Sequence, residues 1–275
     1  MGPHPSYSTH GKTPGPLSAL SRFDRTPDAR HLASMIVLAL DTALSTCSVA
    51  IIRGPETLFD RFTFQAKGHA ETLPPMAAAA LSETGLIAAD IDRIGVVVGP
   101  GQFTGVRVGL AFARGFALGR PNAIVGVNSL RALRDSAAIK GWIAPVVDAR
   151  RGEVFAGLYD ADGDERLQPF AAAPDAAAMR IAEAAGDADA ICLLGSGAGL
   201  LPSDARFYRA DTKSLRGIDP VAVARIAAEA PPPAGPPGPI YLRAPDAKKS
   251  AAALLAGAMA IPGGIRSESG TTDGG

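Results

Sequence analysis

The feature that most constrains this fold is a glycine-rich segment, residues 99–119, that directly follows a short apolar run. The Gly-Pro-Gly tripeptide at its start predicts a tight turn between a buried strand and a helix, with Thr104 as the helix N-cap. Within the helix, Gly105, Gly109 and Ala113 recur every four residues and form a stripe with almost no side chain. A glycine inside a helix costs roughly 1 kcal/mol relative to alanine. The stripe therefore indicates a place where another backbone approaches closely.

Two interpretations of this stripe stay open. The helix is apolar nearly all round, which is typical of a buried helix. The opposing backbone belongs either to the chain's own sheet or to a partner subunit, and in the second case Phe112 and Phe116 lie beside the contact. A phosphate-binding loop has less support, because no Lys-Ser or Lys-Thr follows the turn and the Gly-x-Gly-x-x-Gly spacing does not occur there.

Composition narrows the class of protein. Lys plus Arg and Asp plus Glu both number 27, so the formal net charge is zero and gives no global attraction to nucleic acid or an anionic membrane. The two cysteines, Cys47 and Cys192, form neither a disulfide framework nor a zinc motif. No apolar run approaches the roughly 18 residues of a membrane span. We expect a cytoplasmic protein without membrane contact.

The chain divides into four expected parts. Residues 1–34 are rich in Pro, Gly, Ser, Thr and His and are expected to be disordered. They are either a tail or an upstream-start artefact, since Met35 directly precedes the first predicted strand. We expect an N-terminal lobe with the partner-binding helices over 35–138, a smaller C-terminal lobe over 139–230, and a Pro-rich linker and tail over 231–275.

Two strand–turn–strand units indicate a duplicated lobe. In each unit an apolar strand ends in an Asp and a polar turn, at Asp41-Thr42 and again at Asp148, and a glycine-rich loop containing Gly195 and Gly197 follows a later strand. The pattern resembles the two-lobed actin-like α/β fold (ASKHA, ribonuclease H-like), whose turns hold the phosphates of ATP. The first turn lacks the glycine that would let its backbone approach a phosphate. We therefore interpret these segments as degenerate nucleotide turns, with Asp41 as a structural acid.

A further helix is expected over 69–82, with His69 near its start, Leu73 and Met76 on its apolar side, and two adjacent prolines that kink it or mark its true start. In catalytic relatives of this fold, a His-x-x-x-His pair one helical turn apart binds a metal. Here the second position is Leu73, so we expect His69 to cap the helix or to hydrogen-bond. We predict no metal site, no cofactor and no catalytic residues.

The chain resembles the TsaB (YeaZ) family, bacterial accessory proteins of tRNA threonylcarbamoyladenosine synthesis, at three places. The longest is Gly-Pro-Gly-Gln-Phe-Thr-Gly-Val-Arg-Val-Gly over 99–109, with Gln102 where the family signature has Ser. Residues 148–154 are similar to its D-A-R-x-G-E-V segment and residues 240–243 to its Y-L-R ending. The resemblance implies a non-catalytic subunit that dimerises with, and stabilises, the catalytic TsaD-type subunit that modifies adenosine 37 of ANN-decoding tRNAs. It also implies a small TsaE-type ATPase as a further partner.

By the same resemblance, the signature helix and the helix near His69 form the partner surface, which the chain alone uses for a homodimer, and tRNA is contacted only indirectly. The expected interface residues are Gly105, Arg107, Val108, Gly109, Phe112, Ala113, Phe116, His69, Leu73 and Met76. Gly109→Leu is expected to abolish the heterodimer without unfolding the chain. The alternative function is an ATP-dependent transferase or kinase, or a metalloprotease, of the same superfamily.

Overall fold

The computed structural model describes residues 29–120, 123–210 and 217–243 of the 275-residue chain. All of them except Arg243 belong to one compact unit. Most of the extension that we expected to be disordered, and the tail from 244 onward, lie outside the described residues. Residues 29–34 form a short helix, α1 (Ala29–Ser34), and Leu32 packs against the core. This corrects the expectation of disorder for those six residues.

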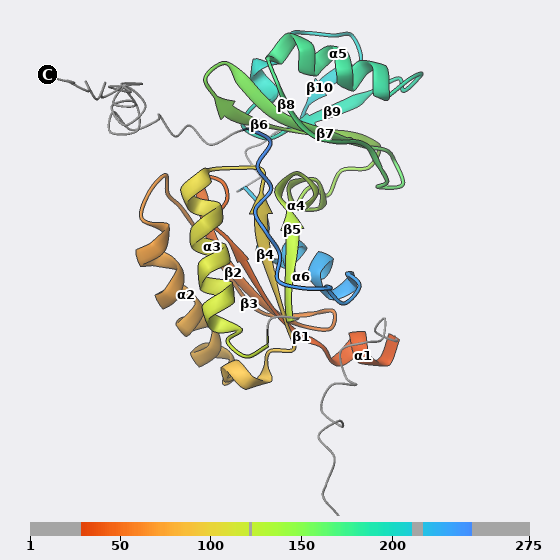
Figure 1. Ribbon diagram of the computed structural model, residues 1–275. Coiled ribbons are helices and arrows are strands. Elements are labelled where there is room, and N and C mark those ends of the chain that lie inside the picture. Colours follow the sequence, from red (N-terminus) through yellow and green to blue (C-terminus); the bar gives the residue numbers. More distant parts are fainter. Residues whose placement is uncertain (1–28, 121–122, 211–216, 244–275) are drawn as a thin grey trace, which may run out of the picture. The chain divides into compact units, whose positions relative to one another are not determined.

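The first sheet has five strands in the order β3-β2-β1-β4-β5 (Figure 1). Strands β1, β2 and β3 are antiparallel neighbours, whereas β4 and β5 run parallel to β1. The central strands are buried along nearly their whole length, as in sheets whose two faces are both covered. Their bounds are β1 (Ile36–Asp41), β2 (Thr46–Arg53), β3 (Glu56–Phe64), β4 (Arg93–Gly99) and β5 (Ile124–Asn128).

Helices cover both faces of this sheet (Figure 1). Successive residues of a strand face opposite sides of the sheet, so neighbouring residues of β4 show which helix covers each face. Gly95 faces Ala227 and Val96 faces Gly109. The helices on one face are α2 (His69–Thr84) and α3 (Phe103–Phe116), and the helix on the other is α6 (Pro220–Glu229).

The second sheet repeats the first. Its order is β10-β9-β6-β7-β8, with β6, β7 and β8 antiparallel and with β9 and β10 parallel to β6. Helix α5 (Pro174–Ala184) packs on β7 and β8. The duplicated, two-lobed α/β fold is thereby confirmed. The strands are β6 (Trp142–Arg150), β7 (Glu153–Tyr159), β8 (Glu165–Ala172), β9 (Ile191–Leu194) and β10 (Phe207–Arg209).

The expected lobe over 139–230 needs a correction, because α6 packs on the first sheet. The buried side chain of Arg93 on β4 donates hydrogen bonds to the carbonyl oxygens of Ala227, Ala228 and Ala230 at 2.7–3.0 Å. Carbonyls at a helix C-terminus have no partner within the helix. Arg93 supplies one, and so the last helix belongs to the first lobe.

One helix start also differs from expectation. Helix α3 begins at Phe103, with Gln102 rather than Thr104 at the N-cap. Helix α4 (Ser129–Asp135) is capped by Asn128, whose side-chain oxygen accepts hydrogen bonds from the backbone N–H groups of Leu130 and Arg131. In both cases the residue at the N-cap has extended backbone angles, which is the conformation an N-cap requires.

The two prolines of α2 do not mark its start, and the alternative that they kink the helix stays a prediction. They lie within the helix, at positions 74 and 75, while the helix begins at His69 and ends before Gly85. Gly85 has a left-handed backbone, with φ 67°, which is a common way to end a helix. The prolines therefore do not mark the start of this helix.

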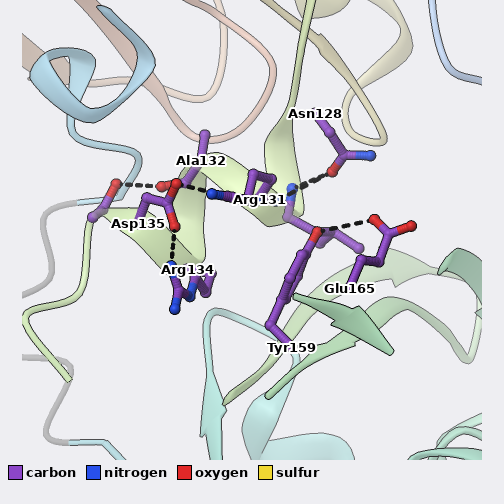
Figure 2. Close-up of polar contacts among 9 residues, drawn as sticks. Asn128, Arg131, Ala132, Arg134, Asp135, Tyr159 and Glu165 are labelled. Carbon is purple, nitrogen blue, oxygen red and sulfur yellow. Dashed lines mark hydrogen bonds and ion pairs between the residues drawn. The ribbon is translucent and has the colours of Figure 1, made fainter. Parts of the chain in front are cut away.

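Helix α4 contacts strands of both sheets, and a polar network anchors it (Figure 2). The Asp135 carboxylate accepts hydrogen bonds from Arg131 Nε and Arg134 Nη1, both at 2.7 Å. The Arg131 guanidinium lies 6.0 Å from the ring centre of buried Tyr159 on β7. Burial raises the pKa of Tyr159, and its hydroxyl donates to Glu165 at 3.5 Å. The network ties α4 to the second sheet.

We predict that Asn128→Ala lowers the free energy of unfolding by about 1 kcal/mol, the usual effect of losing an N-cap side chain. Gln102→Ala is the matched control, because Gln102 occupies the N-cap of α3 without a capping side-chain hydrogen bond. Urea denaturation of both variants checks this. A loss from Gln102→Ala as large as that from Asn128→Ala would contradict the assignment.

Candidate functional site

The turn between β1 and β2 is covered by the glycine-rich loop that starts α3. The Gln102 N–H donates to the Ala43 carbonyl oxygen at 2.7 Å, and the Thr42 hydroxyl donates to the Gly105 carbonyl oxygen at 2.7 Å. A Cβ atom at Gly101 would overlap the carbonyl oxygen of Ala43, and one at Gly105 would overlap that of Thr42. The glycines therefore allow two backbones of the same chain to touch.

The rest of the small-residue stripe also packs inside the chain. A Cβ atom at Gly109 would lie 2.7 Å from Thr42 Oγ1 and 3.4 Å from Val96 Cγ2, and Ala113 is fully buried. Of the two interpretations left open, the own-sheet contact is correct, and Gly105, Gly109 and Ala113 are wrong as partner contacts. Gly109→Leu would force a side chain into the first sheet, so we now expect it to destabilise the fold.

The expected interface residues of α2 are buried as well. His69, Leu73 and Met76 are 6%, 0% and 8% exposed, on a helix that packs against β2, β3 and α3. They are therefore corrected from partner contacts to core positions. His69 is the first residue of the helix, and its Nε2 has no hydrogen-bond partner among the described residues. The expected hydrogen bond is not made by that atom.

Four of the expected interface residues do reach the surface. Arg107 is exposed, and Val108, Phe112 and Phe116 are half-buried. The Phe112 and Phe116 ring centres are 6.0 Å apart. We call these four surface-reaching residues together the outer face of α3, although Phe112 and Phe116 lie roughly 140° and 180° further round the helix axis than Arg107. Their role in a partner contact stays a prediction.

Asp41 is fully buried and serves its own turn. Its Oδ1 accepts a hydrogen bond from the Ala43 N–H at 2.9 Å, and its Oδ2 accepts one from the Thr46 hydroxyl at 3.1 Å. Loss of water around the carboxylate raises its pKa to about 6, although these two hydrogen bonds oppose the shift. Burial, followed by the charge of Asp41, raises the pKa of Cys47 to about 12. The geometry fits the structural role expected for Asp41.

The second turn, at the end of β6, is more open. The Asp148 side chain is 27% exposed and lies 3.1 Å from Arg150 Nη1, while its Oδ1 accepts a hydrogen bond from the Arg150 N–H at 2.7 Å. The Asp148 N–H donates to the Ser196 hydroxyl at 3.1 Å. This turn is thereby connected to the glycine-rich loop after β9.

Gly195 and Gly197 bring that loop against β6. The Gly197 N–H donates to the Val146 carbonyl oxygen at 2.9 Å, and a Cβ atom at Gly195 would lie 2.6 Å from the same oxygen. Gly195 also has φ +110°, which side chains rarely adopt. The close packing of this loop against β6 therefore explains why both positions are glycine, without a ligand.

A pocket of about 250 Å³ lies between the first turn and this loop. Its walls are uncharged and mainly apolar, and exposed Phe64 lies at the end of β3. Sequence reasoning identified the loop but missed Thr46 and Phe64, since nothing in their spacing marks them. The principal lining residues are Leu44, Thr46, Phe64, Val147, Leu194 and Ser196.

Sequence reasoning also missed a contact across α3. Tyr241 follows a backbone hydrogen bond from the Ile240 N–H to the Val98 carbonyl oxygen, and its hydroxyl lies 2.8 Å from Arg107 Nε. Tyr241 belongs to a stretch already singled out by resemblance. No local signal connects it to Arg107, which is 134 residues away.

Neither a metal cluster nor a membrane span occurs in the described residues. Over the ranges given above, no three His, Cys, Asp or Glu side chains gather closely enough to hold a metal ion. No helix in this part of the chain is long and apolar enough to cross a membrane.

We predict that Gly105→Ala lowers the free energy of unfolding by about 2 kcal/mol, because the new methyl group meets the rigid backbone of the β1–β2 turn. Gly115→Ala, in the same helix but with no atom within 4 Å of the new methyl, should raise it by up to about 1 kcal/mol. Thermal or urea unfolding measures both. Equal effects of the two substitutions would refute the close approach at Gly105.

Asp41 also predicts a pH dependence. A carboxyl whose folded pKa is about 6, against 3.8 in the unfolded chain, favours the folded state when protonated. This contribution is present at low pH and is lost between about pH 4 and 6 as the pH rises. Relative to Asp41→Asn, the wild type should lose about 3 kcal/mol of unfolding free energy over that window. If the difference in unfolding free energy between the two proteins did not change with pH, the raised pKa of the buried carboxyl would be contradicted.

Comparisons with known proteins agree with this geometry. The profile of the TsaD family, tRNA N6-adenosine threonylcarbamoyltransferase, matches residues 63–190. Bacillus subtilis TsaB, a tRNA threonylcarbamoyladenosine biosynthesis protein, is 34% identical over 126 residues, 46% of this chain and 55% of that protein. This chain thus spans about half the length of that relative.

Two further relatives match over most of the chain. The Mycobacterium bovis protein Mb3455c is 36% identical over 219 residues, covering 77% of this chain and 93% of that protein. The solved structure of YeaZ from Pseudomonas aeruginosa is 28% identical with a TM-score of 0.61, and the match covers 76% of this chain and all of YeaZ. With the signature loop closing over the β1–β2 turn of a two-lobed α/β fold, this chain belongs to the TsaB (YeaZ) family.

Proposed function

We propose that this chain is a non-catalytic subunit in the biosynthesis of tRNA threonylcarbamoyladenosine. Membership of the TsaB (YeaZ) family supports the pathway, since the Bacillus subtilis and Escherichia coli relatives are named for it. The match to the TsaD profile supports descent from the same ancestor as the catalytic subunit. On this proposal the chain acts in the cytoplasm on adenosine 37 of ANN-decoding tRNAs, through its partner.

The covered β1–β2 turn is the observation that carries the non-catalytic role. In a nucleotide-binding lobe of this fold, that turn must present backbone N–H groups and an acidic side chain to phosphate and metal. Here the acid, Asp41, is buried with both oxygens hydrogen-bonded inside the turn. The glycine-rich loop that starts α3 covers this turn, with Gln102 and Gly105 in contact with its backbone.

The outer face of α3 is the surface proposed for the partner. Phe112 and Phe116 are half-buried with their ring centres 6.0 Å apart, and Arg107 is exposed on another side of the same helix. Aromatic residues and arginine are enriched in protein interfaces. We propose that the TsaD-type catalytic subunit binds here and is stabilised by the contact, and that a small TsaE-type ATPase joins the complex. Without the catalytic subunit, the same face would pair two copies of this chain.

An enzyme of the same superfamily is the second candidate. The observation that favours an enzyme is the uncharged pocket beside the glycine-rich loop after β9, because ligand sites are concave and mostly apolar. An ATP-dependent transferase or kinase would bind its nucleotide there and use Asp41. A metalloprotease would need a metal site as well.

The proposal predicts a one-to-one complex between this chain and the TsaD-type subunit, measured by light scattering. Phe112→Asp should weaken the complex by about tenfold or more, because a buried apolar contact is replaced by a charge. Met179→Asp is the control, since Met179 is 74% exposed on α5, and should leave the complex intact.

Nucleotide turnover is measured in the same experiment. The chain alone should hydrolyse no ATP above background, with or without Mg²⁺. ATP hydrolysis by the purified chain that Asp41→Asn removes would overturn the non-catalytic role and favour the enzyme.

A further inference from the structure

Arg107 contacts two aromatic side chains that come from distant parts of the chain. Phe103 lies one helical turn before it on α3, and the Arg107 guanidinium carbon is 3.6 Å from that ring centre. Tyr241 approaches from the C-terminal segment, and its hydroxyl accepts a hydrogen bond from Arg107 Nε at 2.8 Å. The two rings are themselves 5.3 Å apart. The planar group is therefore held by stacking and by its Nε atom.

The other donors of this guanidinium have no partner in the described part of the chain. Among those residues, no hydrogen bond or ion pair engages Nη1 or Nη2 of Arg107. The residue is exposed, and Phe103 and Tyr241 are 41% and 39% exposed. A free arginine side chain loses much rotational freedom on binding, and part of that loss has already occurred here. The site is a pre-organised pair of N–H donors at the surface.

The C-terminal segment is fixed at three points along α3 and β4. The Ile240 N–H donates to the Val98 carbonyl oxygen at 2.8 Å, and Arg114 Nη2 donates to the Pro237 carbonyl oxygen at 2.8 Å. The hydroxyl of Tyr241 is the third point. Tyr241 is therefore held in position by contacts of its neighbouring residues as well as by its bond to Arg107.

We propose that Arg107 is a specificity-determining contact whose two Nη groups bind one Asp or Glu carboxylate of the protein partner. This inference rests on the proposed function, since it names the chemistry of the partner at the outer face of α3. The arginine fork matches a carboxylate in bidentate geometry, which lysine cannot reproduce. Arginine and aromatic side chains are enriched at the energetically dominant centre of protein interfaces.

A phosphate has the same two-point geometry, so tRNA is the competing source of the anion. The surroundings favour a protein. The guanidinium is bordered by the rings of Phe103 and Tyr241, which are both partly exposed apolar surfaces, and exposed Leu118, at 87%, follows the end of the same helix. The chain as a whole carries no excess of positive charge, whereas phosphate recognition is typically made by clustered cations.

The test measures the affinity of the full chain for the TsaD-type subunit by calorimetry, for wild type and four variants. Arg107→Gln and Arg107→Lys should each weaken binding on the order of 10- to 100-fold, because both lose the fork. Arg114→Gln removes one charge from the same helix and one anchor of the C-terminal segment, and should change affinity less than about threefold. Tyr241→Phe, which loses one hydrogen bond but keeps the guanidinium, should also have a small effect. Thermal melting confirms that each variant is folded.

The outcomes separate this inference from the proposal beneath it. If wild type binds and Arg107→Lys binds equally well, the proposed bidentate contact between Arg107 and a carboxylate is wrong, while the subunit role stands. The fork is also wrong if Tyr241→Phe is as damaging as Arg107→Gln, because Arg107 then acts by holding the C-terminal segment. If Arg107→Gln leaves the protein complex unchanged but weakens tRNA binding by the complex, the anion is a phosphate. If wild type forms no complex, the proposed function fails and this inference fails with it.

Discussion

The first lobe depends on one close contact, that of the α3 backbone at Gly105 with the turn after β1. Thr42 is at the centre of it, because its carbonyl oxygen excludes any side chain at Gly105 and its hydroxyl donates to the Gly105 carbonyl oxygen. Gly109 continues the contact one turn later. With α3 so close to the sheet, Arg107 is left exposed, and Phe112 and Phe116 are left half-buried on another side of the helix. The covered turn and the outer face are therefore two consequences of one packing arrangement.

On the proposed function, the same contact explains how a nucleotide-binding fold serves as a binding subunit. Asp41 keeps its place at the end of β1, but burial and two hydrogen bonds within the turn direct it inward. In the second lobe the glycines at 195 and 197 are likewise used against β6. Residue types that serve ligands in related folds here serve backbone packing. Function is then expected at surfaces rather than at the turns.

Much of the fold could be predicted from the sequence, because apolar periodicity and repeated strand–turn–strand units are local signals. The bounds of α6, Pro220–Glu229, follow from its capping Asp219, its first-turn proline and its apolar spacing. Its location does not, since the bond from Arg93 to the end of α6 spans 134 residues or more. The small-residue stripe likewise identified a close approach but not its partner. Small residues on one side of a helix indicate that another backbone comes close, but only the tertiary fold shows which backbone it is.

The most direct measurement is the labelling rate of a single introduced thiol. Both native cysteines, Cys47 and Cys192, are fully buried, and burial raises the pKa of each, so they should react slowly. A cysteine replacing Ala111, which is exposed on α3, should react quickly with a maleimide and become protected when the TsaD-type subunit is added. A cysteine replacing Met179 on α5 should react at the same rate with or without that subunit. Unchanged labelling at position 111 in a formed complex, or protection at 179 instead, would contradict the account.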